Sequence, residues 1–276
     1  MTLAEQLAAY PLLHAETPLG RIAYRRSGGG APLVLLHGIG SASASWLRQL
    51  QSLSDRFTVL AWNAPGYSKS TSLPMAAPAA ADYAARMWAW LDTLDLTKVT
   101  LAGHSLGALM AGAAMRIAPQ RVERLFLFSP AGGYGRAETA VRESKLRERL
   151  TNLQTLGPAG MAEKRGAAML SSTASAEEIV FTKSVMAEID PSGYTQAVHM
   201  LINGDLAADL AHASCPITIA SGSADTITPP AACQAVAATA HTPWIDLGAV
   251  GHACPLEASA AVNRILNGAE KCAAAA

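Results

Sequence analysis

Charge is scarce in this chain. Only 15% of its 276 residues are Asp, Glu, Lys or Arg, against about 25% in an average globular protein. The 21 basic residues balance the 21 acidic ones, so the chain lacks the positive charge typical of a nucleic-acid-binding protein. Half of the residues are hydrophobic, which excludes global disorder and allows a sizeable core. We therefore expect a globular protein with no nucleic-acid partner.

Long hydrophobic runs and export signals are also missing. No stretch approaches the ~18 uncharged apolar residues that a membrane-spanning helix needs. The N-terminus has no basic segment, and Glu5, Gln6 and Pro11 interrupt any apolar run there. We therefore expect a cytoplasmic protein with no membrane partner.

Cysteine is rare and unevenly distributed. All four cysteines lie in the last quarter of the chain, with no C-x-x-C pair: Cys215, Cys233, Cys254 and Cys272. This pattern excludes a disulfide framework and a cysteine zinc site, and no H-E-x-x-H spacing offers other metal ligands. We expect reduced or buried thiols and no metal. The closing KCAAAA is left out of the fold prediction as a frayed end or a cloning remnant.

Short buried runs alternate with helical stretches over residues 20–130. Unbroken apolar strands separated by helices are typical of a parallel sheet covered on both faces. A Gly-rich break at 131–135 begins a long stretch without a convincing strand, and the alternation returns at Cys215. We predict one α/β core interrupted by a helical cap. The predicted parts are 1–131 (core, first part), 132–213 (cap) and 214–272 (core, second part).

The clearest chemical signal is Gly103-His104-Ser105-Leu106-Gly107, between a predicted strand at 99–102 and a predicted helix at 106–117. G-x-S-x-G in this context is typical of a nucleophile elbow, a strained turn that holds a serine hydroxyl above the sheet. Glycines flank the serine because side chains there would collide across the turn. The alternative is a glycine-rich turn with an incidental serine. We predict that Ser105 is a nucleophile.

A serine hydroxyl is a poor nucleophile at neutral pH and needs a base, which in turn needs an acid to hold it. Of the seven histidines, His252 lies just after the last predicted strand and follows a glycine. Asp225 lies on the loop after the strand predicted at 216–220, which gives the chain order Ser, Asp, His. Asp246, inside the last predicted strand, is the rival acid. We favour Asp225 because acids in such sites lie on loops beyond strand ends.

Acyl chemistry also needs hydrogen-bond donors for an oxyanion. The glycine-containing loop within 35–40 allows backbone N–H groups to turn inward, and we predict the N–H groups of Ile39 and Leu106 as the two donors. His37 is expected to brace this loop by hydrogen bonding, and His104 to pack under the elbow. The remaining histidines are expected on the surface or in the cap: His14, His199, His212 and His241.

With these residues the chain resembles the α/β-hydrolase superfamily, in its capped subgroup of esterases, lactonases and carbon–carbon bond hydrolases. The matching stretches are LLHGIG (35–40), WNAPGYSKS (62–70), LAGHSLGALMAG (101–112), GSADTITPP (222–230) and VGHACPLE (250–257). The resemblance implies an eight-stranded, mostly parallel sheet with helices on both faces and a helical cap inserted after strand six. It also implies a Ser-Asp-His triad and no cofactor.

The chain departs from relatives in two loops. Where they usually carry D-x-P-G-x-G-x-S, Asn63 replaces the aspartate and Ser68 the second glycine. That loop is structural in the family, so the change concerns local bonding rather than chemistry. Ala253 follows His252, where carbon–carbon hydrolases acting on ring-cleavage products often have tryptophan. A serine at position 105 also argues against haloalkane dehalogenases and epoxide hydrolases, which use a carboxylate nucleophile.

We predict a serine hydrolase that cleaves carboxylic esters through an acyl-enzyme intermediate. The same triad leaves open enol-lactone or carbon–carbon bond hydrolysis in aromatic breakdown, thioester cleavage and perhydrolysis, and some relatives are non-catalytic small-molecule receptors. The expected partner is a small, ester-like molecule, and a homodimer is left open.

The cap is expected to cover the pocket. Four methionines are scattered through it: Met161, Met169, Met186 and Met200. Together they would give a pliable apolar wall, although packing between cap helices explains any single one. Arg136, Arg142 and Arg165 are candidates to meet a carboxylate-bearing substrate. Because arginine is seldom buried, we expect each of them to face solvent.

Overall fold

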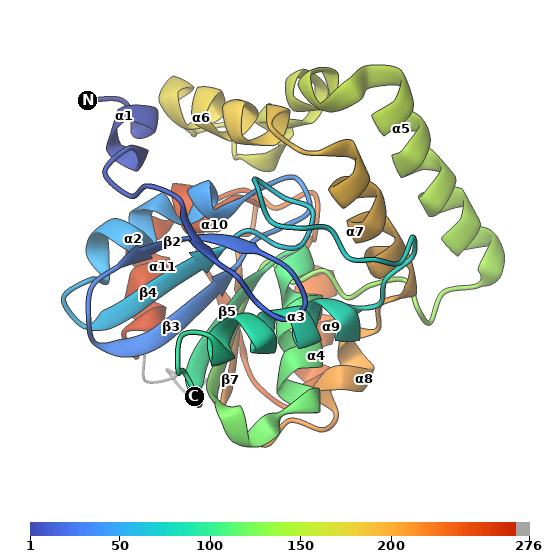
Figure 1. Ribbon diagram of the computed structural model, residues 1–276. Helices are drawn as coiled ribbons and strands as arrows, with labels where there is room; N and C mark the ends of the chain where they lie inside the picture. The colour runs from blue at the N-terminus through green and yellow to red at the C-terminus, as the bar shows by residue number, and fades with distance from the viewer. Residues whose placement is uncertain (269–276) are drawn as a thin grey trace, which may run out of the picture.

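The computed structural model describes residues 1–268, and its centre is one eight-stranded sheet (Figure 1). The strands are Leu13–Ala15 (β1), Ile22–Ser27 (β2), Ala31–Leu36 (β3), Phe57–Trp62 (β4), Val99–His104 (β5), Val122–Phe128 (β6), Ile217–Ser221 (β7) and Trp244–Asp246 (β8). Their spatial order is β1-β2-β4-β3-β5-β6-β7-β8. β2 pairs antiparallel with β1 and β4, and the other neighbouring pairs are parallel. The mostly parallel, eight-stranded sheet predicted from the sequence is confirmed.

The central strands are the apolar runs that predict them. Every residue of β4 and β5 is buried, because helices cover both faces of a parallel sheet and neither set of alternate side chains meets solvent. In β3, Leu33 and Leu35 join one core cluster, while Val34 and Leu36 join another on the opposite face.

The edge strand β1 is missed by the sequence analysis. It has three residues, of which Leu13 and His14 are exposed, so it forms no apolar run. Its strand character comes from pairing with β2, where Leu13 lies opposite Tyr24.

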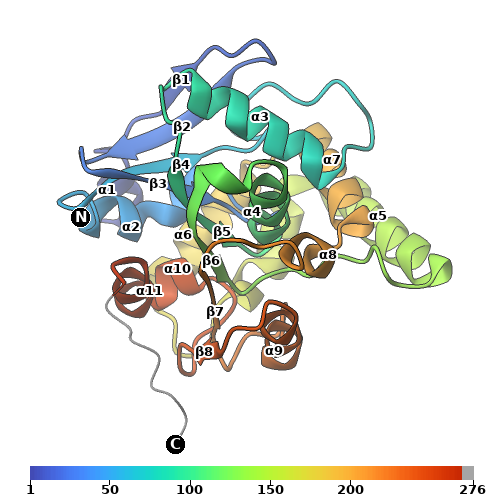
Figure 2. The same cartoon turned by 90° about the horizontal axis from the view of Figure 1, so that it is seen from below.

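Helices cover both faces of the sheet, with α3 and α4 on one side and α10 and α11 on the other (Figure 2). The core helices are Leu3–Leu7 (α1), Leu47–Ser52 (α2), Ala80–Asp92 (α3), Leu106–Ile117 (α4), Pro230–Thr239 (α9), Cys254–Glu257 (α10) and Ser259–Leu266 (α11). No helix within the described residues is long and apolar enough to cross a membrane.

The helical insertion predicted after strand six is confirmed. It contains Thr139–Arg165 (α5), Ala176–Ala187 (α6), Pro191–Asn203 (α7) and Leu206–Leu210 (α8), and α5, α6 and α7 lie along one side of the core (Figure 1). The predicted domain boundaries stay a prediction, and residues 269–272, including Cys272, lie outside the described residues, as does the rest of KCAAAA.

Helix α5 bends in its second half. Gly157 has φ 61° and ψ 177°, and Pro158 follows it. Glycine adopts positive φ without the steric cost of a Cβ, and proline removes a backbone donor, so the two together end one helical segment and start another. The cap helix therefore changes direction between residue 157 and its end at Arg165.

Candidate active site

Ser105 lies on a sharp turn between the end of β5 and the start of α4. Its φ is 52° and its ψ −116°, a conformation that is strained for a residue with a Cβ. A Cβ on Gly103 would lie 2.5 Å from the Gly107 carbonyl oxygen, and one on Gly107 would lie 2.2 Å from the Leu36 carbonyl oxygen. Both glycines are therefore required for the turn to close and for α4 to pack on β3, as the G-x-S-x-G interpretation predicts.

Asp225 and His252 meet at the ends of two neighbouring strands. Asp225 follows β7, His252 follows β8, and His252 Nδ1 lies 2.9 Å from Asp225 Oδ2. Their side chains are 0% and 1% exposed. Parallel strands with adjacent carboxyl ends bring these loops together although 27 residues separate the two side chains.

The Asp225 carboxylate is held in its ionised form. Its Oδ1 accepts hydrogen bonds from the backbone N–H groups of Ile227, at 2.8 Å, and Thr228, at 2.9 Å. Burial favours the neutral acid, but the hydrogen bond and charge of His252 and the Thr228 amide outweigh it and lower the pKa of Asp225 to about 2. The carboxylate can therefore fix the imidazole ring and stabilise its protonated form.

Thr228 belongs to the same cluster and is missed by the sequence analysis. Its Oγ1 donates to Asp225 Oδ2 at 2.9 Å, and it lies 3.1 Å from His252 Nδ1 and 3.0 Å from the Ser129 carbonyl oxygen. The available signal is the aspartate three residues earlier, since Asp side chains commonly bind backbone amides two or three residues on and shape such turns.

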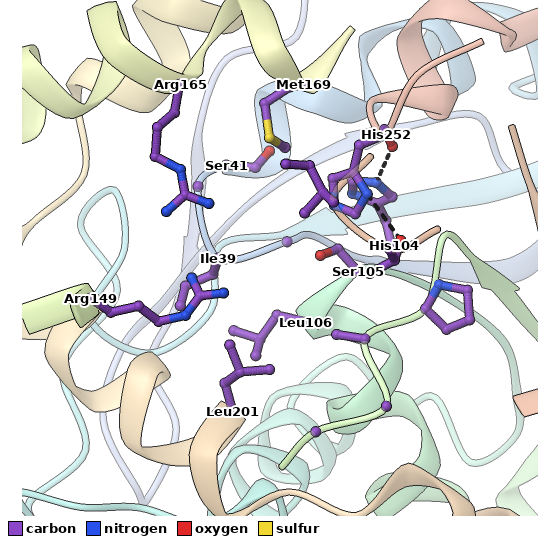
Figure 3. Close-up of a pocket in the computed structure, with 18 of the residues that line it drawn as sticks. Ile39, Ser41, His104, Ser105, Leu106, Arg149, Arg165, Met169, Leu201 and His252 are labelled. Carbon is purple, nitrogen blue, oxygen red and sulfur yellow. Dashed lines mark hydrogen bonds between the residues drawn. The ribbon is translucent and has the colours of Figure 1, made fainter. Parts of the chain in front are cut away.

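Ser105 and His252 both line one cavity of about 210 Å³ beneath the cap. The Ser105 hydroxyl is directed into this cavity (Figure 3). Within residues 1–268, no hydrogen bond links Ser105 Oγ to the His252 ring. Such contacts are often long in the absence of substrate and shorten when it binds.

The two predicted oxyanion donors flank Ser105. Among the described residues, neither the Ile39 nor the Leu106 backbone N–H has a hydrogen-bond acceptor in the protein. Leu106 is the first residue of α4, where N–H groups have no partner within the helix. The loop at Ile39 is held by Tyr67, whose hydroxyl donates a hydrogen bond to the Ile39 carbonyl oxygen at 3.0 Å. Gly38 brings this loop close, because a Cβ there would lie 3.1 Å from Ser105 Cβ.

His37 and His104 support the site as neutral side chains. His37 Nε2 accepts from the Ala64 N–H at 3.0 Å, so its Nδ1 carries the proton and donates to the Gly38 carbonyl at 2.8 Å. His104 Nε2 donates to the His252 carbonyl at 2.7 Å. Burial lowers the pKa of His37 to about 4, and burial together with nearby His252 lowers that of His104 to about 3. His37 braces the loop and His104 packs beneath the elbow, as predicted.

These two histidines should make the fold sensitive to acid. Between about pH 6.5 and pH 4 the unfolded chain binds protons at His37 and His104 that the folded chain does not. The free energy of unfolding should therefore fall as the pH drops through this window, by about 1.4 kcal/mol per pH unit for each histidine. Urea unfolding at pH 7 and pH 5 measures this loss, and His104→Asn should reduce the dependence on pH. The matched control is His14→Asn, whose histidine is exposed. A urea midpoint unchanged between pH 7 and pH 5 would contradict the prediction.

Three further residues that the sequence analysis names are Asp246, the rival acid, and the two loop substitutions Asn63 and Ser68. Asp246, the rival acid, is exposed at the end of β8 and accepts from the Gly248 N–H at 2.9 Å. Asn63 is buried, and its Oδ1 accepts from the Ser43 N–H at 2.7 Å, so it keeps the acceptor that an aspartate would provide. Ser68, in place of a glycine, has a positive φ of 38°.

None of the cysteines among residues 1–268 lines the cavity. Cys215, Cys233 and Cys254 are free thiols, and burial raises the pKa of each. Within residues 1–268 no three His, Cys, Asp or Glu side chains come together in a way that could hold a metal ion. His14, His212 and His241 are exposed, and His199 is half-buried in α7.

The cap supplies the opposite wall of the cavity. Its apolar lining includes Met161, Met169, Met186 and Leu201, so three of the four cap methionines line the cavity, and Met200 does not. The expectation for Arg165 is wrong: it is half-buried and lines the cavity, because the bend in α5 turns the end of the helix over the pocket.

The two other predicted arginines lie outside the cavity lining. Arg136 forms an ion pair with Asp205 at 2.6 Å. Arg142 donates to Asn203 Oδ1. The sequence analysis does not single out Arg149, which also lines the cavity.

Comparisons with known proteins extend over most of the chain. The Alpha/beta hydrolase family matches residues 33–265. An uncharacterized protein of Mycobacterium tuberculosis is 41% identical over 128 residues, 45% of this chain and 36% of that protein, so the match spans little more than a third of that relative's length. The (E)-2-((N-methylformamido)methylene)succinate hydrolase of Acinetobacter baylyi is 28% identical over 209 residues, 73% of this chain and 75% of that enzyme. A thermophilic esterase from Thermogutta terrifontis, solved with malate bound, superposes with a TM-score of 0.83 at 23% identity, covering 94% of this chain and 97% of that one.

Proposed function

Because the chain belongs to the alpha/beta hydrolase family, we propose that it is a serine hydrolase that cleaves carboxylic esters through an acyl-enzyme intermediate. The observation that carries the proposal is the buried Asp225–His252 pair, 2.9 Å apart, beside the same cavity as a serine on a strained strand-to-helix turn. An acid, a base and a hydroxyl in this arrangement are the parts that acyl transfer needs.

In the proposed cycle Ser105 Oγ attacks the ester carbonyl carbon while His252 Nε2 takes the hydroxyl proton. Asp225 accepts the hydrogen bond from Nδ1 and stabilises the imidazolium. The Ile39 and Leu106 N–H groups bind the oxyanion of the tetrahedral intermediate. His252 then gives its proton to the leaving alcohol, and the acyl group stays on Ser105. Water, activated by His252, attacks the acyl-enzyme, the acid leaves, and the proton returns to Ser105.

Catalysis is better supported than a role as a receptor. A receptor needs only the cavity, whereas here an ionised aspartate is buried against a histidine and two backbone N–H groups beside Ser105 have no protein acceptor. A buried charge or a buried N–H group without an acceptor costs free energy, and a bound reacting group can supply the missing partner. The arrangement supports a site that stabilises developing charge.

A second candidate keeps the triad and changes the bond that is cleaved. The same nucleophile and oxyanion donors can serve the hydrolysis of lactones, thioesters and vinylogous diketones, and the formation of peracids. The relative from Acinetobacter baylyi supports this breadth, because its name describes hydrolysis of a substituted methylene-succinate and it matches 73% of this chain. A panel of enol-lactones, thioesters and vinylogous diketones, each compared by kcat/KM with methyl butyrate, would distinguish these reactions.

The ester proposal is tested with a fluorophosphonate probe and p-nitrophenyl esters. We expect one covalent adduct, located at Ser105 by mass spectrometry, and turnover of p-nitrophenyl acetate and butyrate. The cavity of about 210 Å³ favours short acyl groups, so octanoate should be the poorest of the three substrates. A protein that neither hydrolyses these esters nor forms the adduct would contradict the proposal.

A further inference from the structure

Two arginines of the cap extend into the cavity that contains Ser105. Arg149 lies in the first part of α5, Arg165 is its last residue, and the bend at Gly157 lies between them. Figure 3 shows both guanidinium groups directed from the cap toward the space above Ser105 and Leu106. The two positive charges therefore face the proposed nucleophile across the cavity.

Neither Arg149 nor Arg165 forms an ion pair within residues 1–268. Arg149 Nη1 is buried and makes no hydrogen bond. No Asp or Glu lines the described cavity. The adjacent Glu148 is hydrogen-bonded to Lys145, at 3.0 Å. That hydrogen bond is the main cause that lowers the pKa of Glu148, and the charges of Arg149 and Arg165 also contribute, but the Glu148 carboxylate contacts neither guanidinium.

Two other cap arginines, outside the cavity, have side-chain oxygen partners, although the Nε atom of Arg142 is itself buried without one. Arg136 is paired with Asp205, and Arg142 with the side-chain oxygen of Asn203. A guanidinium in a partly apolar cavity is unfavourable unless an acceptor is present. The remaining lining supplies few acceptors, because much of it is methionine, leucine, isoleucine and glycine. The missing acceptor is therefore expected to arrive with the ligand.

We propose that the substrate carries a free carboxylate, which Arg149 and Arg165 bind while its ester carbonyl lies at Ser105. This inference rests on the proposed function and names its substrate class. A guanidinium donates two parallel hydrogen bonds to a carboxylate. A carboxylate is also smaller than phosphate or sulfate, which suits a cavity of about 210 Å³ that must hold the reacting ester as well. Because the whole chain has a net charge of zero, this selectivity is local to the cavity.

The kinetic test compares monomethyl glutarate with dimethyl glutarate, which share acyl length and leaving group and differ in one negative charge. We expect the wild-type protein to prefer the monoester by at least about tenfold in kcat/KM, since hydrogen bonds to charged groups contribute about tenfold to hundredfold in affinity. Arg149→Gln and Arg165→Gln should each lower the monoester-to-diester ratio about tenfold or more. The matched control is Arg147→Gln, which removes an exposed charge from the same helix and should leave the ratio as in wild type.

A binding measurement separates this inference from the proposed function. Glutarate is titrated calorimetrically into the Ser105→Ala protein, with and without Arg149→Gln, and inorganic phosphate is the comparison anion. We expect glutarate to bind and Arg149→Gln to weaken binding about tenfold or more. Equal turnover of both esters without glutarate binding would overturn the inference and leave the esterase proposal intact. Arginine-dependent glutarate binding without turnover of either ester would do the reverse, and preference for phosphate over glutarate would overturn the assignment to carboxylate.

Folding of the variants provides a further check. Because Arg149 Nη1 has no partner in the described protein, replacing this side chain removes no protein hydrogen bond at that atom. Arg149→Gln should therefore unfold at a temperature at least as high as wild type, as expected when a group is kept for binding at some cost in stability. A large loss of stability would indicate that Arg149 has a structural role and would overturn the inference.

Discussion

Ser105→Ala should lower kcat for ester hydrolysis by roughly four to six orders of magnitude. The hydroxyl oxygen is the atom that forms the acyl-enzyme in the proposed cycle. Of the three serines with positive φ within residues 1–268, which are Ser68, Ser105 and Ser129, only Ser105 lines the cavity. The oxyanion donors and the cavity would remain, so a small residual rate above that in water is expected. Steady-state turnover of p-nitrophenyl butyrate by purified protein measures the loss.

The same variant should fold normally. Alanine keeps the Cβ of serine and therefore the same strained φ of 52°, and Ser105 Oγ makes no hydrogen bond in the described structure that the substitution would break. Its melting temperature should stay close to that of wild type. The matched control is Ser144→Ala, which changes an exposed serine of α5 and should retain full activity. Wild-type turnover in Ser105→Ala would contradict the assignment of the nucleophile.

Asp225→Asn should lower kcat by roughly three to four orders of magnitude. The reason is that the hydrogen bonds around this side chain would fix the orientation of the asparagine amide. Asp225 Oδ1 accepts from two backbone N–H groups, those of Ile227 and Thr228. An asparagine would keep its carbonyl oxygen there and turn its NH₂ group toward His252 Nδ1. His252 would then carry its proton on Nε2 and could not accept the proton of Ser105. The pH–rate profile and kcat for p-nitrophenyl butyrate measure the effect.

Two further variants make this test specific. Thr228→Val removes one donor to the Asp225 carboxylate but leaves its charge, so kcat should fall only about tenfold. Asp246→Asn changes the rival acid, which is exposed and bonds only to its own turn among the described residues, and should leave kcat as in wild type. If Asp246→Asn abolished activity and Asp225→Asn did not, the acid would be assigned to the wrong residue.

Much of the fold could be predicted because its signals are local. The strands β4 and β5 are fully buried and mostly apolar, and helix α4 begins and ends at the predicted residues 106 and 117. The elbow could be predicted because its glycines are required by contacts within a few residues or with the neighbouring strand. In contrast, β1 is defined by its pairing with β2 rather than by its own composition.

The cap arginines that line the cavity could not be predicted from local sequence patterns. Helix α5 is rich in charged residues of both signs, and most of its length is exposed or half-buried. The bend at Gly157 changes which of its side chains meet the core. Arg149 before the bend and Arg165 after it both line the cavity. Arg136 and Arg142 instead bind Asp205 and Asn203.

The amino-acid sequence by itself determined the alternating α/β core and the glycine-flanked serine, because each depends on residues close together in the chain. It also gave the order of hydroxyl, carboxylate and imidazole, which is a property of the chain itself. Only the tertiary structure decided that Thr228 shares the Asp225–His252 hydrogen bonds and that two cap arginines without protein partners face Ser105. These features depend on where loops at neighbouring strand ends and a bent helix come to lie, and long-range packing, rather than local propensity, sets those positions.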